Sequence, residues 1–248
     1  MARRATIIHH AKQQLPASSP TLTLGGAQEF FDKRDLEIRP KEHYVPAFFR
    51  AYELLGYTRV FVTPEEADWL RRNVAPGQPR ELPHLFRELS PRSCLTELHA
   101  VAGKKVAVVH FPLIDHQSTP SEQMQDAVRR EIAAQKAQCD LVIGMSHWGR
   151  QQEFTLLSNG VPGLDILLGA GAGTPGPDLI ANNGKTLWAR SNVKGYTVTI
   201  IQLLAWPGAQ DRWRLEENIR AAAPVLEEHV ADDPTIKALF HPQSTPAS

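Results

Sequence analysis

The sequence has few of the features that mark a specialised class of protein. Its 248 residues include two cysteines, Cys94 and Cys139, which are too few for a disulfide framework, so free buried thiols are expected. Lys and Arg number 27, as do Asp and Glu, so the net charge predicts no nucleic-acid or anionic-membrane surface. No apolar run approaches the roughly 18 residues of a transmembrane segment. The hydrophobic content of 42% suits an ordinary globular core.

Strand-like and helix-like segments alternate along the chain, which predicts an α/β fold. The expected helices are 2–14, 41–55, 64–73, 120–138 and 217–240, the last with a break near 232–234. The expected strands are 22–24, 58–62, 104–110, 140–144, 166–168, 186–190 and 196–203. The last two strands alternate like those of a hairpin or a sheet edge. Thr63 and Pro64 are typical of a helix N-cap and first turn.

One pattern typical of a dinucleotide-binding site and one typical of a serine hydrolase occur after predicted strands. Neither pattern is complete. Residues 171–176 fit G-x-G-x-x-G, but a dinucleotide site needs a helix starting at those glycines, and Pro175 and Pro177 intervene. An acidic residue is expected about 20 positions further on, where this chain has Arg190. Residues 144–148, Gly-Met-Ser-His-Trp, resemble a serine hydrolase elbow except that Trp stands where the pattern needs Gly.

Four segments occur in an order and spacing that indicate a different family of proteins. Residues 57–69 run from a strand into Thr-Pro-Glu-Glu-Ala-Asp, 103–109 form a strand, 140–149 end in Ser-His-Trp-Gly, and 161–175 end in the glycine-rich loop. Together they resemble the 5′-nucleotidase group of calcineurin-like metallophosphoesterases, whose motifs there are Gly-Asn-His-Glu-Phe-Asp, Ser-His-Leu-Gly and Gly-His-Ser-His-Thr. The resemblance covers residues 16–240. It implies two mixed β-sheets packed face to face, flanked by helices, with two metal ions at the strand ends.

The resemblance also implies which residues stand at the metal-ligand positions. Such enzymes clamp the attacking and leaving oxygens between two ions held by Asp, Asn and His side chains. At the bridging Asp this chain has Gln28, or else Ala27, and at the catalytic His it has Glu65. Among the positions where the family has a metal ligand, only position 147 keeps the family's residue, His147. The degenerate positions are Pro64 at the Asn, and Gly171 and Gly173 at the paired His residues.

The missing ligands predict a domain without two-metal hydrolase activity, because Lewis-acid polarisation and metal-bound hydroxide depend on the ions. We expect no catalytic residue, no cofactor and a binding or assembly module, with a small-molecule or protein partner still to be identified. The alternative is a phosphoester hydrolase with a reduced site, in which Gln28, Glu65 and His147 hold one divalent ion weakly. The competing structural interpretations are a hydrogen bond for His147 and a helix-dipole position for Glu65.

Three further side chains are candidates for the same region. His110 and His116 flank Phe-Pro after a buried strand and could line the rim of the site, although an ordinary surface loop explains them equally simply. Trp148 could cover an emptied cleft with its ring.

The domain prediction is a single metallophosphoesterase-like domain over 1–240 and a disordered Pro/Ser/Thr-rich tail over 241–248. We expect no counterpart of the separate C-terminal domain that binds the base in 5′-nucleotidases. The family's first strand, with its Asp-x-His, also has none, so we expect that strand to be missing. The residues Met1–Arg4 have the charge of a signal peptide without its apolar region. The resemblance suggests a bacterial periplasm or cell envelope if an upstream signal exists, and the cytoplasm otherwise.

Overall fold

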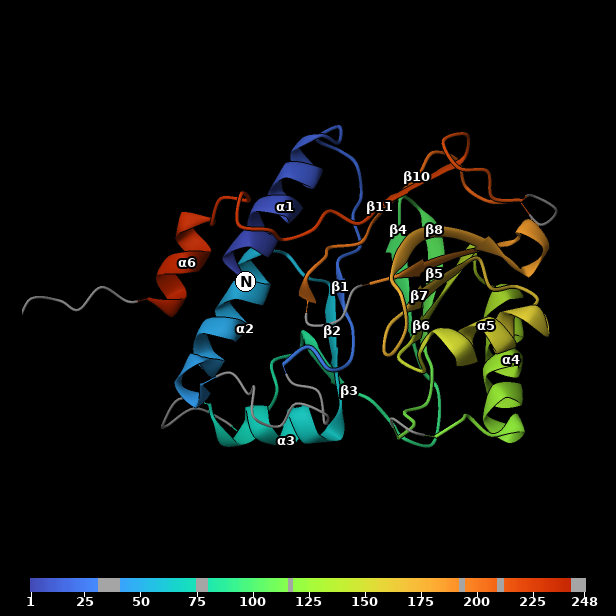
Figure 1. Ribbon diagram of the computed structural model, residues 1–248, viewed down its shortest axis with the longest axis horizontal. Coiled ribbons are helices and arrows are strands. Elements are labelled where there is room, and N and C mark those ends of the chain that lie inside the picture. The colour runs from blue at the N-terminus through green and yellow to red at the C-terminus, as the bar shows by residue number, and fades with distance from the viewer. Residues whose placement is uncertain (31–40, 75–79, 116–117, 192–194, 209–211, 242–248) are drawn as a thin grey trace, which may run out of the picture. The chain divides into compact units, whose positions relative to one another are not determined.

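The computed structural model describes residues 1–30, 41–74, 80–115, 118–191, 195–208 and 212–241 (Figure 1). The chain divides into two compact units, Met1–Glu88 with Leu226–Ser248 and Leu89–Val225. The first unit therefore combines segments from both ends of the sequence, and the second is the stretch between them. Among the described residues, no helix combines the length and apolar character needed to cross a membrane.

The first unit contains a parallel sheet in the order β1-β2-β3. Its elements are α1 (Ala2–Gln13), β1 (Leu24–Gly25), the 3-10 helix η2 (Glu42–Tyr44), α2 (Val45–Leu54), β2 (Arg59–Val62), α3 (Pro64–Arg72), β3 (Phe86–Glu88) and α6 (Pro234–Phe240). Helices α1 and α6 are far apart in sequence but pack together. The Thr6 hydroxyl donates to the Ala231 carbonyl over 2.7 Å, and His9 Nδ1 lies 3.1 Å from the Asp233 carboxylate.

An aromatic cluster forms much of the core of the first unit. The ring of Phe30 lies 5.3 to 6.2 Å, centroid to centroid, from four other rings in edge-to-face or tilted arrangements. The four partners are Phe48, Tyr52, Trp69 and Phe86. Such geometries place the positive edge of one ring against the negative face of another. The segment after β1, which carries Phe30, is thereby fixed to α2, α3 and β3.

The second unit is built on a six-stranded mixed sheet in the order β4-β5-β6-β7-β9-β8. Its elements are β4 (Leu95–Val101), β5 (Lys104–His110), α4 (Glu122–Lys136), β6 (Leu141–Ser146), α5 (Arg150–Ser158), β7 (Ile166–Gly169), β8 (Gly176–Ala181), the 3-10 helix η3 (Asn182–Gly184), β9 (Thr186–Arg190), β10 (Ile200–Leu203) and β11 (Ile219–Ala222). Strands β5, β6, β7 and β9 run parallel, and β4 and β8 are antiparallel edges. Strands β10 and β11 form a separate antiparallel pair.

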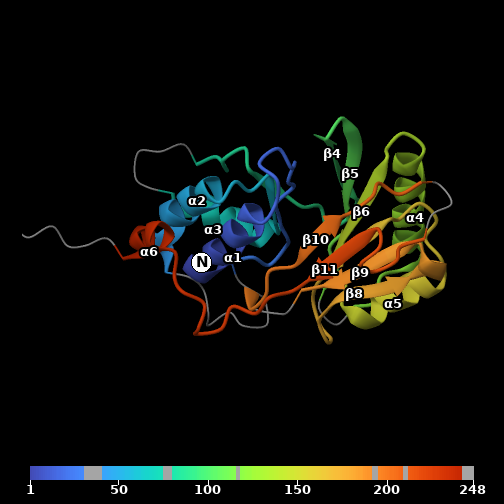
Figure 2. The same ribbon diagram turned by 90° about the horizontal axis from the view of Figure 1, so that it is seen from above.

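Helices α4 and α5 pack on one face of this sheet (Figure 2). Val128 and Ile132 of α4 and Leu156 of α5 are fully buried in one cluster with Val109 and Leu167 of the strands. All six residues of β6 are buried. A parallel strand with both faces covered reads as a continuous apolar run, and this explains why the sequence predicts these central strands well.

Two predictions from the sequence need correction. The helix predicted over 217–240 with a break near 232–234 is wrong before the break, where the chain forms the strand β11 and an irregular segment, because β11 pairs with β10 and Pro224 cannot donate within a helix. After the break, the short helix α6 confirms it. Residues 186–190 do form a hairpin strand, but with β8 and not with 196–203. Strand β9 is not a sheet edge, because it lies between β7 and β8.

The α/β class is confirmed, as are the helices predicted at 2–14, 64–73 and 120–138. Strands β3, β4 and β8 and helix α5 are absent from the prediction. The single domain over 1–240 stays a prediction. The tail beyond His241 lies outside the described residues.

Candidate functional site

The predicted site residues are divided between the two units. Gln28, Pro64 and Glu65 belong to the first unit. His147 and the glycines at 171 and 173 belong to the second. The chemistry of each group is set by its own surroundings.

Glu66 is the central polar group at the start of α3, and the sequence prediction passed over it in favour of Glu65. Thr63 caps this helix by accepting the N–H of Glu66, and the Glu66 carboxylate accepts the N–H of Thr63 over 2.8 Å in return. The same carboxylate accepts the N–H groups of Gln28 over 3.1 Å and Phe30 over 2.8 Å. It therefore ties the segment after β1 to the helix. The signal that could have found it is the capping box Thr-x-x-Glu.

Burial is the main cause of the shifted pKa of Glu66. The side chain is fully buried, and burial raises its pKa to about 7 against three backbone N–H groups that lower it. The backbone of Gln28, which donates one of these bonds, has a φ of 62°, a left-handed conformation that is uncommon outside glycine. A buried carboxylate that collects three backbone donors is an anchor for a loop.

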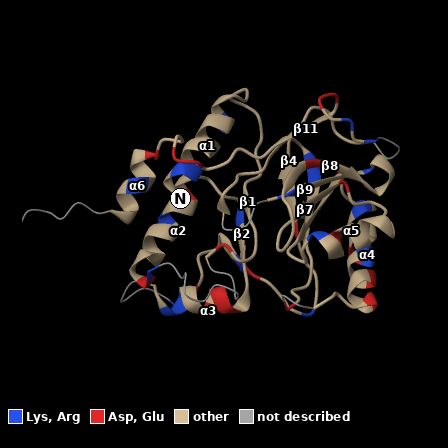
Figure 3. Cartoon of the chain, viewed as in Figure 1, with Lys and Arg blue, Asp and Glu red and all other residues tan. Residues whose placement is uncertain are grey.

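Glu65 and Pro64 lie in the first turn of α3 beside Glu66. Glu65 is exposed, and Pro64 has no donor atom in its side chain. The helix has acids in its first turn and Arg71 and Arg72 in its last (Figure 3). This distribution suits the helix dipole and supports the structural interpretation of Glu65.

His147 follows β6 and is nearly buried, with 9% of its surface exposed. Its Nε2 accepts the backbone N–H of Ile114 over 3.2 Å. An imidazole nitrogen that accepts a hydrogen bond carries no proton, so the neutral ring has its proton on Nδ1. The Nε2 lone pair is thus directed at the Ile114 N–H, and a metal ion at this nitrogen would displace that bond. This geometry supports a structural hydrogen bond for His147.

The His147 ring stacks on His110, with centroids 5.9 Å apart. His110 donates from Nδ1 to the carbonyl of Phe111 over 2.9 Å. Burial lowers the pKa of His110 to about 4, so this ring is neutral at physiological pH. His110 is therefore a buried ring at the end of β5 and not part of a surface loop. His116, the other predicted rim residue, lies outside the described residues.

Trp148 belongs to the core of the second unit, and the prediction of a ring over an emptied cleft is wrong. Its indole Nε1 donates to the Pro112 carbonyl over 2.8 Å, and its ring lies 5.1 Å from that of Phe111. Ser146 is also buried and accepts the N–H of Trp148 over 3.1 Å. An exposed nucleophile is required for a hydrolase elbow, so the structure does not support that pattern.

The glycine-rich loop joins β7 to β8, two strands, and so lacks the helix that a dinucleotide site requires. At Gly171, with a φ of 78°, an added Cβ would stand 2.5 Å from the carbonyl oxygen of His147. At Gly173, with a φ of 111°, an added Cβ would overlap Arg150 Cβ. The backbone path of the loop therefore leaves no room for side chains at residues 171 and 173.

Arg190, at the end of β9, is the residue that the sequence prediction missed in the second unit. Its guanidinium is fully buried and donates to Glu153 of α5 and to carbonyl groups of the glycine-rich loop. The sequence pattern of residues 186–190 predicts a hairpin or sheet-edge strand and assigns Arg190 no role. All five residues of β9 are buried instead.

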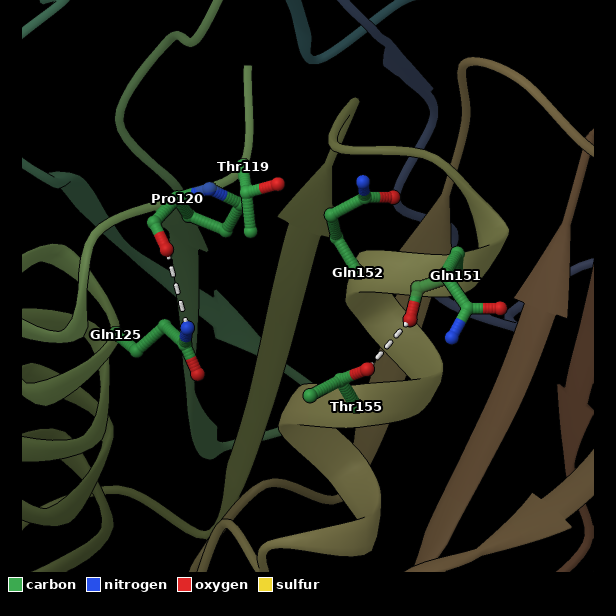
Figure 4. Close-up of a pocket in the computed structure, with 6 residues that line it drawn as sticks. All are labelled: Thr119, Pro120, Gln125, Gln151, Gln152 and Thr155. Carbon is green, nitrogen blue, oxygen red and sulfur yellow. Dashed lines mark hydrogen bonds between the residues drawn. The ribbon is translucent and has the colours of Figure 1, made fainter. Parts of the chain in front are cut away.

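A hollow beside α5 offers neutral groups only (Figure 4). It is lined by Thr119, Pro120, Gln125, Gln151, Gln152 and Thr155. The Gln125 amide donates to the Pro120 carbonyl over 3.1 Å, and the Thr155 hydroxyl donates to the Gln151 carbonyl over 2.9 Å. No side chain in this lining titrates near neutral pH, so the hollow supplies no acid, base or charged ligand. In the part of the chain that the structure describes, no three His, Cys, Asp or Glu side chains are grouped to hold a metal ion.

Comparison with known proteins gives likeness of structure only. No family model and no curated protein sequence matches the chain. Among solved structures, the sulfate thiohydrolase SoxB of Thermus thermophilus matches 96% of this chain at 18% identity, with a TM-score of 0.66. The NAD nucleotidase NadN of Haemophilus influenzae matches 80% of it at 12% identity, with a TM-score of 0.49. The chain spans 45% of the length of SoxB and 36% of that of NadN. The chain has a metallophosphoesterase-like fold, as the resemblance in sequence predicts.

Proposed function

We propose that this chain is a 5′-nucleotidase-like metallophosphoesterase domain that has lost two-metal hydrolysis and acts as a binding or assembly module. The observation that carries the proposal is the backbone of the glycine-rich loop. Its Gly171 lies against the His147 carbonyl so closely that even a Cβ does not fit. A histidine at this position, as in the family's loop, requires a different backbone path.

The donor atoms elsewhere support the same conclusion. Two-metal catalysis stabilises the attacking and leaving oxygens between ions that several oxygen and nitrogen ligands hold. Pro64 offers no ligand atom, and Glu65 is an exposed first-turn acid. The Nε2 lone pair of His147 accepts the Ile114 N–H. These residues do not fit a two-metal centre.

The proposal is tested by metal content and hydrolysis together. Protein purified without chelator is analysed for divalent metals, then assayed with an aryl phosphate and added Mn²⁺. We expect no stoichiometric metal and no hydrolysis above the rate with Mn²⁺ alone. The matched variant is His147→Ala, which removes the one retained ligand type.

A stoichiometric ion together with hydrolysis that His147→Ala abolishes would overturn the proposal in favour of a rebuilt single-metal site. Hydrolysis that is unchanged in His147→Ala would instead indicate a contaminating phosphatase. The partner of the module, its compartment and the bacterial cell-envelope assignment stay predictions. Binding of a small molecule or a protein is sought after the hydrolase test, since the same preparation serves both.

A further inference from the structure

Arg190 and Glu153 form a charged pair in the interior of the second unit, and both side chains have zero exposure. Burial of a guanidinium removes five N–H donors from water, and each donor that finds no acceptor destabilises the folded state. The partners that Arg190 finds are therefore informative. Most of them belong to a single short loop.

The guanidinium collects carbonyl groups from consecutive residues of the glycine-rich loop. Its Nη2 lies 3.2 Å from the carbonyl oxygens of Ala170 and Gly171 and 3.1 Å from that of Ala172. Its Nε donates to the Thr174 carbonyl over 3.3 Å. Four carbonyl dipoles thus point toward one fixed cation. This arrangement resembles the coordination of an ion by backbone oxygens, with a side chain as the positive centre.

The position of the cation is fixed from the opposite side. Nη1 of Arg190 donates to Glu153 Oε2, which also accepts the indole N–H of Trp188 over 3.0 Å. Gly169 permits this approach, because a Cβ there would overlap Glu153 Oε2. The carboxylate therefore orients the guanidinium toward the loop as well as neutralising it.

We propose that Arg190 is the structural cation of the loop over residues 169–174. A site whose ligands surround a metal becomes ordered when the metal binds, whereas here a covalently attached guanidinium supplies the positive centre. The loop is consequently ordered without metal, and this order excludes the conformation in which residues 171 and 173 would carry ligands. The inference rests on the proposed function, since it accounts for how the domain retains this loop after losing its metal ligands.

Two backbone amides report on the loop directly. The N–H of Arg150 donates to the Ala172 carbonyl over 2.8 Å, and that of Ser191 donates to the Gly169 carbonyl over 3.2 Å. Their hydrogen exchange is measured in EDTA and again with Mn²⁺. The Val142 N–H, which donates to Asp165 Oδ2 over 2.7 Å in the same unit, is the internal reference.

In the wild-type protein we expect both reporter amides to exchange slowly in EDTA and to be unaffected by Mn²⁺. Arg190→Lys keeps the charge but cannot form the fork of parallel bonds, so both reporters should exchange at least about tenfold faster while Val142 is unchanged. The double variant Arg190→Met with Glu153→Leu removes the charges without leaving one unpaired. It should fold, yet keep the fast exchange of the reporters.

Three results would overturn the inference. In the first, the two reporter amides of the wild type exchange slowly only after Mn²⁺ is added. In the second, they exchange in Arg190→Lys at the wild-type rate. In the third, they exchange slowly again in the double variant. The last would mean that Arg190 merely neutralises Glu153. Hydrolysis of an aryl phosphate is measured separately, so a failure of the proposed function is distinguishable from a failure of the loop assignment.

Discussion

Two loops, which the sequence resemblance aligns with metal-binding positions of metallophosphoesterases, are held by oppositely charged side chains in the two units. In the first unit a carboxylate collects N–H groups, and in the second a guanidinium collects carbonyl groups. The donors to Glu66 are the backbone N–H groups of Gln28, Phe30 and Thr63. The acceptors of Arg190 in the loop are the carbonyls of Ala170, Gly171, Ala172 and Thr174.

The two centres differ in what balances their charge. Arg190 is paired with the Glu153 carboxylate as its buried counter-charge. Glu66 titrates near neutral pH, since burial and, to a smaller extent, the nearby charge of Glu29 together raise its pKa to about 7 against the three backbone N–H donors that lower it. The first loop should therefore be sensitive to pH, and the second should depend on its ion pair.

The largest effect is expected when the ion pair of the second unit is broken. Glu153→Gln keeps the shape of the side chain but leaves the Arg190 charge buried without a counter-charge, which should lower the free energy of unfolding by about 3–5 kcal/mol. Urea denaturation measures it. The control is Glu217→Gln, which breaks the ion pair with Arg214 at 2.8 Å, in which both side chains are more than 60% exposed. That change should cost less than about 1 kcal/mol.

Equal losses in the two variants would show that the buried pair contributes no more than a surface pair. The comparison between the loops would then fail, because the second loop would not depend on its cation.

A second prediction separates a steric obstacle from backbone strain. Gly171→Ala places a Cβ 2.5 Å from the His147 carbonyl oxygen, whereas Gly160→Ala, at a similar φ of 82°, meets nothing within 4 Å. The left-handed conformation alone should cost about 1–2 kcal/mol in both variants. The collision should bring the loss in Gly171→Ala to about 3–4 kcal/mol. Thermal unfolding of both variants checks this, and equal shifts in Tm would mean that the loop yields easily.

The sequence predicts these two loops unequally. In the first unit, Thr63 and Pro64 predict where α3 begins, and the structure confirms the cap. The same Thr-x-x-Glu spacing assigns Glu66 to the capping box, although the family alignment drew attention to Glu65. The contacts of Glu66 with Gln28 and Phe30 span more than 35 residues, and no local pattern carries that information.

In the second unit, the polar residues of β9 misled the interpretation. Polar residues stand at both ends of the segment, Thr186 and Arg190, and the pattern predicts a hairpin or sheet-edge strand. Both are buried, because their polar atoms bond to backbone: the Thr186 hydroxyl donates to the Leu164 carbonyl over 2.7 Å, and Arg190 donates to the loop. The order of polar and apolar residues along a strand shows which side chains are polar. It does not show whether other segments of the chain provide buried hydrogen-bond acceptors for them. Central apolar strands such as β6 are predictable because apolar side chains can be buried without a specific hydrogen-bond acceptor or counter-charge.

The smallest effect tests the anion of the first unit. The pKa of Glu66 in the folded chain, about 7, exceeds its ordinary value of 4.5, so between these values the folded chain holds a proton that the unfolded chain releases. The stability that this proton contributes is fully present below about pH 4.5 and is lost as the pH rises through 7. Relative to Glu66→Gln, which cannot titrate, the wild type should lose roughly 1 kcal/mol for each pH unit in this interval. Urea denaturation of both proteins at pH 5, 6, 7 and 8 measures the difference, from which all other titrating groups cancel. Parallel curves would mean that the three N–H donors keep the carboxylate charged throughout, in which case both loops are held by permanent charges and differ only in sign.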